Sequence, residues 1–143
     1  MPTTKKKATT KKEVYKEAIG RRKSASARVR IYPEKKASKD YNITVNEKPY
    51  KKYFPLAKQH NTVISPFEKT GENFVVTVKV SGGGIESQTE AIRMGIARIL
   101  ARENEDWKKK MRSYGYLTRD PRVVERKKFG KRKARRPQQW RKR

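Results

Sequence analysis

The chain has 143 residues, of which 40 are lysine or arginine and 14 are aspartate or glutamate, and its formal net charge at pH 7 is +26. With 33% hydrophobic residues, it can build one compact domain with basic extensions, but not two independent hydrophobic cores. A charge this far from zero repels itself, so we expect a polyanionic partner. Nucleic acid is the first candidate and an anionic membrane surface is the second.

Several kinds of site are excluded by the residue types that are missing. The sequence contains no cysteine and a single histidine, His60, which excludes disulfides, cysteine-ligated zinc, thiol catalysis and sites built on two histidines. The first thirteen residues contain no apolar core of a secretory signal, and no segment approaches the roughly eighteen apolar residues of a membrane span. We therefore expect a cytosolic protein that does not span a membrane. We also expect no cofactor, no small-molecule substrate and, with nucleic acid as the favoured polyanion, no membrane partner.

The positive charge is concentrated at the two ends of the chain. Residues 1–12 contain five lysines, residues 126–143 contain eleven lysines or arginines, and neither segment contains an acid. These ends carry +16 of the +26, which leaves +10 in the middle. Because segments without acids cannot form internal ion pairs, we expect these two ends to be disordered in isolation. We predict a disordered lysine-rich extension at 1–13, a globular α+β domain at 14–117 and an extended basic tail at 118–143.

The first predicted element is an extended stretch over Val14–Tyr32. Within Ala25–Ile31, every second residue is apolar, and the residues between them include Arg28 and Arg30. A period of two places these two sets on opposite faces of a strand, so one face is apolar and the other carries arginine. Pro33 ends the stretch.

Three short elements are predicted next. Ile43–Val45 is a short strand followed by Asn46, a residue typical of turns. Lys51–Phe54 is predicted as a short helix stopped by Pro55. Thr62–Phe67 is compatible with either a helix or a strand.

The strongest predicted strand is Phe74–Val80, whose dense apolar residues favour a central strand buried on both faces. Gly82–Gly84 follow, and a glycine-rich turn before a helix can hold a nucleotide phosphate. The Walker pattern is absent, however, and Ser87 stands where the dinucleotide pattern requires its third glycine. We therefore favour a strand-to-helix turn that needs unusual backbone angles and that brings its amides close to an RNA phosphate.

Two helices complete the predicted domain. Ser87 and Glu90 fit a capping box, which predicts that the first helix begins near Ser87. Asn104 as a cap and Gly115 as a stop predict the second helix. The first helix has an apolar face with spacings of seven, four and three residues: Ile85, Ile92, Ile96 and Ile99.

Two basic segments are candidates for binding nucleic acid. Arg21, Arg22 and Lys23 are consecutive cations, which favours an external counter-charge over the alternative of a merely solvated turn. Cations on alternate strand residues, as at Arg28 and Arg30, are about 6.6 Å apart, close to the spacing of successive phosphates. In the tail, lysines and arginines can neutralise phosphates, and two aromatic rings, Phe129 and Trp140, can stack on unpaired bases. The alternative for the tail is a nonspecific charged segment that aids solubility.

Enzymatic function has almost no support in the sequence. Most acids lie among lysines or in a predicted first turn of a helix, where they are solvated or cap the helix. Ser24 and Ser26 have no histidine partner except the distant His60.

Four spaced motifs stand in order along the sequence: Gly20–Ser24 with Ala27–Arg30, Val80–Ile85, Ala91–Arg98, and Leu117–Lys128. Together they closely resemble the small-subunit ribosomal protein S9 family, in its bacterial or organellar form. The resemblance covers about Tyr15–Arg143. It implies an α+β fold of the ribosomal protein S5 domain 2-like type, with a mostly four-stranded sheet backed by helices.

This resemblance also implies a location in the head of the small subunit, bound to ribosomal RNA beside neighbouring head proteins. The family's tail crosses the head and touches the anticodon stem-loop of peptidyl-site tRNA. The tRNA contact carries over to Arg141, Lys142 and Arg143, although Arg141 replaces a usual serine and Trp140 a usual tyrosine. The residues expected to bind rRNA are Arg21, Arg22, Lys23, Arg28, Arg30, Gly83, Gly84, Arg119, Arg122, Arg126, Lys127, Lys128, Lys131, Arg135 and Arg136.

Two other functions compete with a ribosomal role. A protein that compacts nucleic acid by charge alone would explain the net charge of +26, but not the ordered motifs in the middle. An RNA-processing enzyme on a related fold would need an acid-base group or metal cluster that the sequence does not supply. A ribosomal protein of the cytoplasm is therefore expected, and the lysine-rich start without arginine favours a bacterial source over a mitochondrial one.

Overall fold

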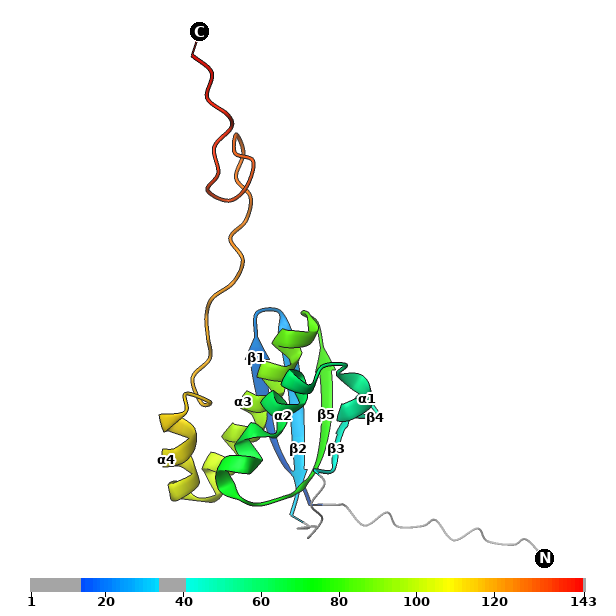
Figure 1. The fold of residues 1–143 in the computed structure, drawn as a ribbon. Coiled ribbons are helices and arrows are strands. Elements are labelled where there is room, and N and C mark those ends of the chain that lie inside the picture. The colour runs from blue at the N-terminus through cyan, green and yellow to red at the C-terminus, as the bar shows by residue number, and fades with distance from the viewer. Residues whose placement is uncertain (1–13, 34–40, 143) are drawn as a thin grey trace, which may run out of the picture.

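The computed structural model describes residues 14–33 and 41–142. In this part of the chain, helices cover one face of a five-stranded mixed sheet (Figure 1). The predicted disordered extension at 1–13 lies outside the described residues. In chain order, the elements are β1 (Lys16–Arg22), β2 (Ala25–Tyr32), β3 (Ile43–Val45), β4 (Lys48–Pro49), α1 (Tyr50–Tyr53), α2 (Ala57–Thr70), β5 (Val75–Ser81), α3 (Ile85–Glu103) and α4 (Glu105–Ser113).

The strands lie in the order β1-β2-β5-β3-β4. β3 runs parallel to β5, and the other neighbouring pairs are antiparallel. A sheet backed by helices agrees with the sequence prediction, and the fifth strand, β4, adds only two residues to the mostly four strands expected. Asn46 and Glu47 have φ angles of 44° and 68° and form the turn between β3 and β4, so the turn predicted at Asn46 is confirmed.

The predicted extended stretch Val14–Tyr32 consists of two strands joined by a tight turn. Arg22 is the cross-strand partner of Ala25, which leaves only Lys23 and Ser24 between the strands. Lys23 has a φ of 50°, a left-handed conformation that usually selects glycine or asparagine. Because the sequence carries neither residue there, it contains no turn signal. The basic cluster therefore lies at the end of β1 and in the turn.

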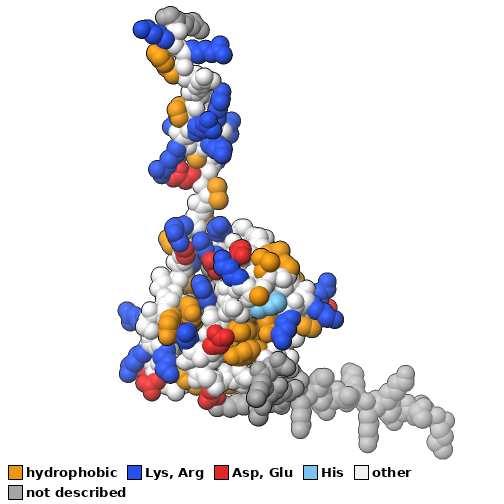
Figure 2. Space-filling model, viewed as in Figure 1, with side chains coloured by type: hydrophobic (Ala, Val, Ile, Leu, Met, Phe, Trp, Pro, Cys, Tyr) orange, Lys and Arg blue, Asp and Glu red, His pale blue; other side chains and the backbone are white. Residues whose placement is uncertain are grey.

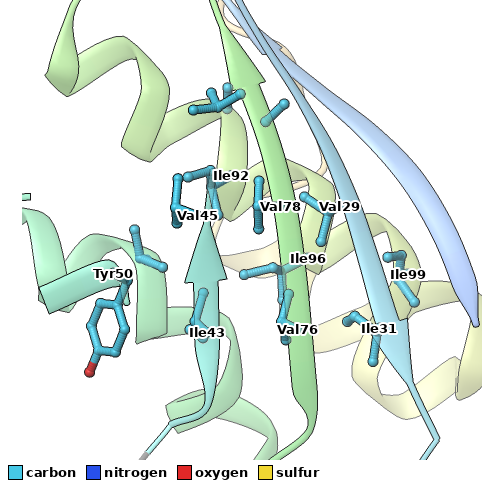
Figure 3. Packing of buried hydrophobic residues seen from close by; sticks show 14 of the residues in the cluster. Val29, Ile31, Ile43, Val45, Tyr50, Val76, Val78, Ile92, Ile96 and Ile99 are labelled. Atoms are coloured by element: carbon cyan, nitrogen blue, oxygen red, sulfur yellow. The ribbon is translucent and has the colours of Figure 1, made fainter. Parts of the chain in front are cut away.

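The hydrophobic core lies between the sheet and the helices α2 and α3 (Figure 3). Alternate residues of β2 and β5 point toward the helices, and the helical face predicted from isoleucine spacing packs against them. Close approach of β1 to α3 depends on Gly20 and Gly95, which face each other without side chains. Labelled residues that form this layer in Figure 3 are Val29, Ile31, Val76, Val78, Ile92, Ile96 and Ile99.

β5 is central in the sheet, as predicted, but it is buried on one face only. Val76, Val78 and Val80 are buried, whereas Lys79 is exposed and Thr77 is half-buried. The prediction of a strand covered on both faces is therefore wrong. The reason is that the helices of the described chain cover a single face of the sheet (Figure 1).

Helix α2 contains Thr62–Phe67, the segment that the sequence left open between helix and strand. Pro66 lies inside this helix, and its missing N–H leaves the carbonyl of Thr62 without its helical partner. The hydroxyl of Ser65 donates a hydrogen bond to that carbonyl at 2.9 Å. Gly71, with a φ of 73°, ends the helix.

Helix α3 begins two residues before Ser87, with Gly84 as its N-cap and no side-chain cap. The predicted capping box is therefore wrong. Ser87 is buried in the helix, and the carboxylate of Glu90 instead accepts a hydrogen bond from Arg22 Nε at 2.6 Å. Ile85, which was assigned to the apolar face, is 46% exposed because it lies at the very start of the helix.

The other two helices agree closely with the sequence. The side chain of Asn104 accepts a hydrogen bond from the Asp106 N–H at 3.0 Å, which confirms the predicted cap of α4. Gly115, with a φ of 70°, follows the end of that helix. The short helix α1 ends before Pro55, as predicted, although it begins and ends one residue earlier than expected.

β1 forms an edge of the sheet, and side chains of α3 cover its outer side. Arg98 Nη1 donates to the Ile19 carbonyl at 2.6 Å, and Arg102 Nη1 donates to the Glu17 carbonyl at 3.3 Å. These two arginines therefore bind backbone oxygens that no neighbouring strand pairs with.

Candidate nucleic-acid interface

The uncovered face of the sheet carries a group of cations. Arg28 and Arg30 of β2 point away from the helices, as the alternation predicted. Lys79 of β5 lies directly opposite Arg28 in the strand register. Like charges placed opposite each other destabilise a sheet unless a counter-charge is present, so this pair favours an anion over the face.

Glu17 of β1 supplies part of that counter-charge. Its carboxylate lies 2.7 Å from Arg30 Nε and 3.5 Å from Arg28 Nε. The hydrogen bond from Arg30 to Glu17 raises the pKa of the Arg30 guanidinium. One carboxylate shared by two arginines leaves Arg28 incompletely neutralised, and among the described residues Lys79 forms no ion pair.

A shallow hollow of about 540 Å³ lies over this face. Its polar lining can donate hydrogen bonds and positive charge to phosphate oxygens. We call these residues the open-face site; those that carry charged or polar side chains are Arg28, Arg30, Thr44, Asn46, Glu47, Thr77 and Lys79.

The cations of the Gly20–Lys23 cluster do not all face the same way. Arg21 and Lys23 are exposed, and Arg21 lies on the open side of the sheet, opposite Ser26. Arg22 lies opposite Ala25 and faces the helices, and its side chain is only 12% exposed. The structure therefore places two of the three cations where RNA can reach them.

The glycine turn lies against the turn of the β1–β2 hairpin. Gly82 and Gly83 have φ angles of 71° and 65°, and a Cβ on Gly83 would lie 2.9 Å from the backbone nitrogen of Ala25. These glycines are thus required for packing, which is the structural interpretation favoured from the sequence. Gly84 is exposed at the first turn of α3, where free backbone N–H groups can meet an anion.

Beyond α4, the chain leaves the domain and runs away from it (Figure 1). Figure 2 shows lysine and arginine side chains along much of this segment. Both predicted stacking rings are bare, with Phe129 96% and Trp140 79% exposed. The predicted contact residue Arg143 lies outside the described residues. Predicted sites in the tail that are exposed are Arg119, Arg122, Arg126, Lys127, Lys128, Lys131, Arg135, Arg136, Arg141 and Lys142.

The tail is not extended throughout. Lys131 and Pro137 form an isolated β-bridge, and Arg132 N donates to the Arg136 carbonyl at 2.9 Å. Arg135 pairs with Glu125 at 2.6 Å, and this contact lowers the pKa of the Glu125 carboxyl. The local fold-back shortens the reach that a fully extended tail would have.

The order of these features along the chain matches a known family. A family model described as ribosomal protein S9/S16 matches residues 20–143. The chain belongs to this family. It is therefore a ribosomal protein of the small subunit, a component of a ribonucleoprotein that binds ribosomal RNA and serves translation. The family is typically non-enzymatic, and its members have rRNA and other ribosomal proteins as partners.

Two further properties concern the described residues 14–33 and 41–142 alone. Their helices are too short or too polar for any of them to cross a membrane. Their histidine and acidic side chains form no group of three that could hold a metal ion.

Sequence reasoning missed two features of the ribosomal protein's surface. Lys79 alternates with Val78 and Val80, and this local signal would have placed it on an open face if the strand had been treated as one-sided. The partner of Arg22, Glu90, lies 68 residues away, and no local pattern connects the two.

Proposed function

We propose that this family member binds the rRNA of the small-subunit head through its domain and tail, and that the tail also contacts peptidyl-site tRNA during translation. Membership over residues 20–143 is the observation that carries the proposal. The proposal includes an S5 domain 2-like topology and a chain divided into an extension (1–13), a domain (14–117) and a tail (118–143). It also includes neighbouring head proteins as partners and a location on cytoplasmic ribosomes.

The open-face site supports binding of rRNA through the domain. Arg28 and Lys79 are cross-strand neighbours of like charge, and a phosphate between them would remove their repulsion. Arg21, on the same side of the sheet, extends the positive surface toward the hairpin turn. Contacts of this kind position RNA without reading its sequence.

Replacing Arg28 and Lys79 together with glutamine should weaken binding to a small-subunit rRNA transcript. If each cation neutralises one phosphate, the slope of log affinity against log salt should become shallower by about 2. Filter binding over a range of salt concentrations measures both quantities. The matched control replaces Lys58 and Lys110, exposed lysines of α2 and α4, with glutamine. Equal losses in the two double variants would mean that the open face has no special role.

The end of the tail supports a contact with tRNA. Arg141 and Lys142 are exposed beside the bare ring of Trp140. Cations at the end of a long segment can reach a phosphate backbone well away from the domain. The family resemblance suggests tRNA as the bound nucleic acid, and the exposed cations can pair with its phosphates.

Deleting Arg141–Arg143 should lower the affinity of assembled small subunits for peptidyl-site tRNA by roughly tenfold, or ~1.4 kcal/mol. The reason is the loss of three cations at the point of contact. Equilibrium binding of tRNA to subunits that carry the shortened protein measures the change. A control that replaces Lys131, Arg132 and Lys133 with glutamine removes the same charge further from the end. An unchanged tRNA affinity after the deletion would rule out the contact while leaving the rRNA-binding role intact.

A further inference from the structure

Arg22 is shielded, unlike its neighbours Arg21 and Lys23. Its side chain is 12% exposed and lies on the helix-covered side of the sheet. The space beside it measures about 30 Å³, against about 540 Å³ for the hollow over the open face. The carboxylates of Glu90 and Asp120 line this space and would repel a phosphate, so Arg22 is poorly placed to contact RNA.

The guanidinium of Arg22 connects three parts of the chain. Its Nε donates to Glu90 Oε2 of α3 at 2.6 Å. Its Nη2 lies 3.2 Å from Asp120 Oδ2, and its Nη1 donates to the carbonyl of Arg122 at 2.6 Å. The planar fork of arginine suits such simultaneous contacts. β1 and α3 are thereby joined to residues 116–122, which we call the tail root.

Further contacts hold the tail root in place. Asp120 accepts a hydrogen bond from the Arg122 N–H at 3.0 Å and pairs with Arg122 Nη2 at 2.7 Å. These bonds from Arg122 hold the pKa of the Asp120 carboxyl well below its usual range, so this partner of Arg22 is ionised at neutral pH. Upstream, the Tyr116 N–H donates to the Met111 carbonyl at 3.0 Å, and the guanidinium of Arg93 lies 4.8 Å from the Tyr116 ring centroid.

We propose that Arg22 is a positioning residue that fixes the direction in which the tail leaves the domain, through its contacts with Asp120 and the Arg122 carbonyl. If the tail root is already fixed in the free protein, the tail loses less conformational entropy when it binds RNA. This strengthens binding without adding a phosphate contact. The identity of the RNA that the tail binds rests on the proposed function. The contacts of Arg22 lie within the chain and do not depend on it.

A distance measurement on the full chain without RNA tests the proposal directly. The sequence has no cysteine, so spin labels can be placed on Lys58→Cys in α2 and Val124→Cys just beyond the root. Pulsed electron paramagnetic resonance should give a narrow distance distribution for this labelled chain. Arg22→Gln, Asp120→Asn and the charge-preserving Arg22→Lys should each broaden it, whereas the control Arg126→Gln should not. Distributions as narrow as that of the parent in Arg22→Gln and Asp120→Asn would overturn the proposal.

RNA binding gives a second readout, in which the Asp120 variant is the most informative. Asp120→Asn leaves the Arg22–Glu90 pair intact, so it tests the proposal even if Arg22→Gln fails to fold. It also makes the chain more positive, so charge alone predicts tighter binding to a small-subunit rRNA transcript. Positioning predicts the opposite, a Kd raised roughly 3- to 10-fold with an unchanged salt slope.

Tighter binding of Asp120→Asn, or a slope made shallower by about 1 in Arg22→Gln, would overturn the positioning role. Failure of the unmodified chain to bind the transcript would count against the proposed function, and the distance measurement would still decide the role of Arg22.

Discussion

Truncating the chain after Glu125 is expected to weaken binding to small-subunit rRNA more than any substitution in the domain. The truncation removes all eleven lysines and arginines of residues 126–143, a segment that contains no acid. If these cations neutralise about eight phosphates of single-stranded or loop RNA, the slope of log affinity against log salt should become shallower by roughly 5 to 6. Titration of the full and truncated chains with an rRNA transcript at several salt concentrations measures the difference.

A chain with the same tail residues in shuffled order is the matched control for that truncation. It keeps the charge and both aromatic rings but changes the spacing of the cations and breaks the Glu125–Arg135 pair. If the shuffled tail restores the affinity in full, charge alone explains its binding, as for a nonspecific tail. A slope that changes by less than about 2 on truncation would show that few of the eleven cations contact phosphates.

Replacing Gly20 with alanine is expected to destabilise the domain by ~3 kcal/mol or more, because the new methyl group has no room. A Cβ at this position would lie 1.8 Å from the Ala91 carbonyl oxygen and 2.7 Å from the Gly95 nitrogen. Both atoms belong to the backbone of α3, so β1 and α3 would have to separate. Urea denaturation followed by circular dichroism measures the change in the free energy of unfolding.

Gly84→Ala provides the control for this substitution. A Cβ on Gly84 would have no atom within 4 Å, and its φ of −91° suits any residue. The control should therefore leave the free energy of unfolding within about 1 kcal/mol of the parent. A change at Gly20 no larger than the change at Gly84 would mean that β1 and α3 can separate at little cost.

The strands were predictable where a local pattern decided them. Alternation in Ala25–Ile31 predicted both the buried side of β2 and the outward direction of Arg28 and Arg30. The same period was present around Lys79, but the consecutive apolar residues Phe74, Val75 and Val76 also fit a strand covered on both faces. Which faces of a sheet are covered depends on where the helices pack, and alternation within one strand does not report that.

The start of α3 shows a long-range contact overriding a local pattern. Ser87 and Glu90 have the spacing of a capping box, yet Glu90 binds Arg22, which lies 68 residues earlier in the chain. Left-handed φ angles at Gly82 and Gly83 let the chain turn early enough for the helix to begin at Ile85. The pattern was present in the sequence, but the tertiary partner of Glu90 was not visible there.

For the candidate RNA-binding residues, too, a local pattern was not enough to predict which side chains are exposed. Arg21 and Arg22 are adjacent, so they lie on opposite faces of β1, but no register for the hairpin could be inferred because its turn residues, Lys23 and Ser24, are atypical. A stretch of three cations was therefore treated as one surface. A typical turn dipeptide at these two positions would have revealed the hairpin, and the alternation of β1 would then have separated Arg22 from its neighbours.

The arginines that bind the edge of β1 have a consequence for the protein before it joins a ribosome. A bare strand edge invites a strand from a second copy, which is a common start of aggregation. Arg98 and Arg102 occupy the Ile19 and Glu17 carbonyls that such a strand would need. These contacts therefore protect the RNA-free protein against aggregation through the edge of β1. The residues that provide this protection are arginines, which also contribute to the positive charge that attracts nucleic acid.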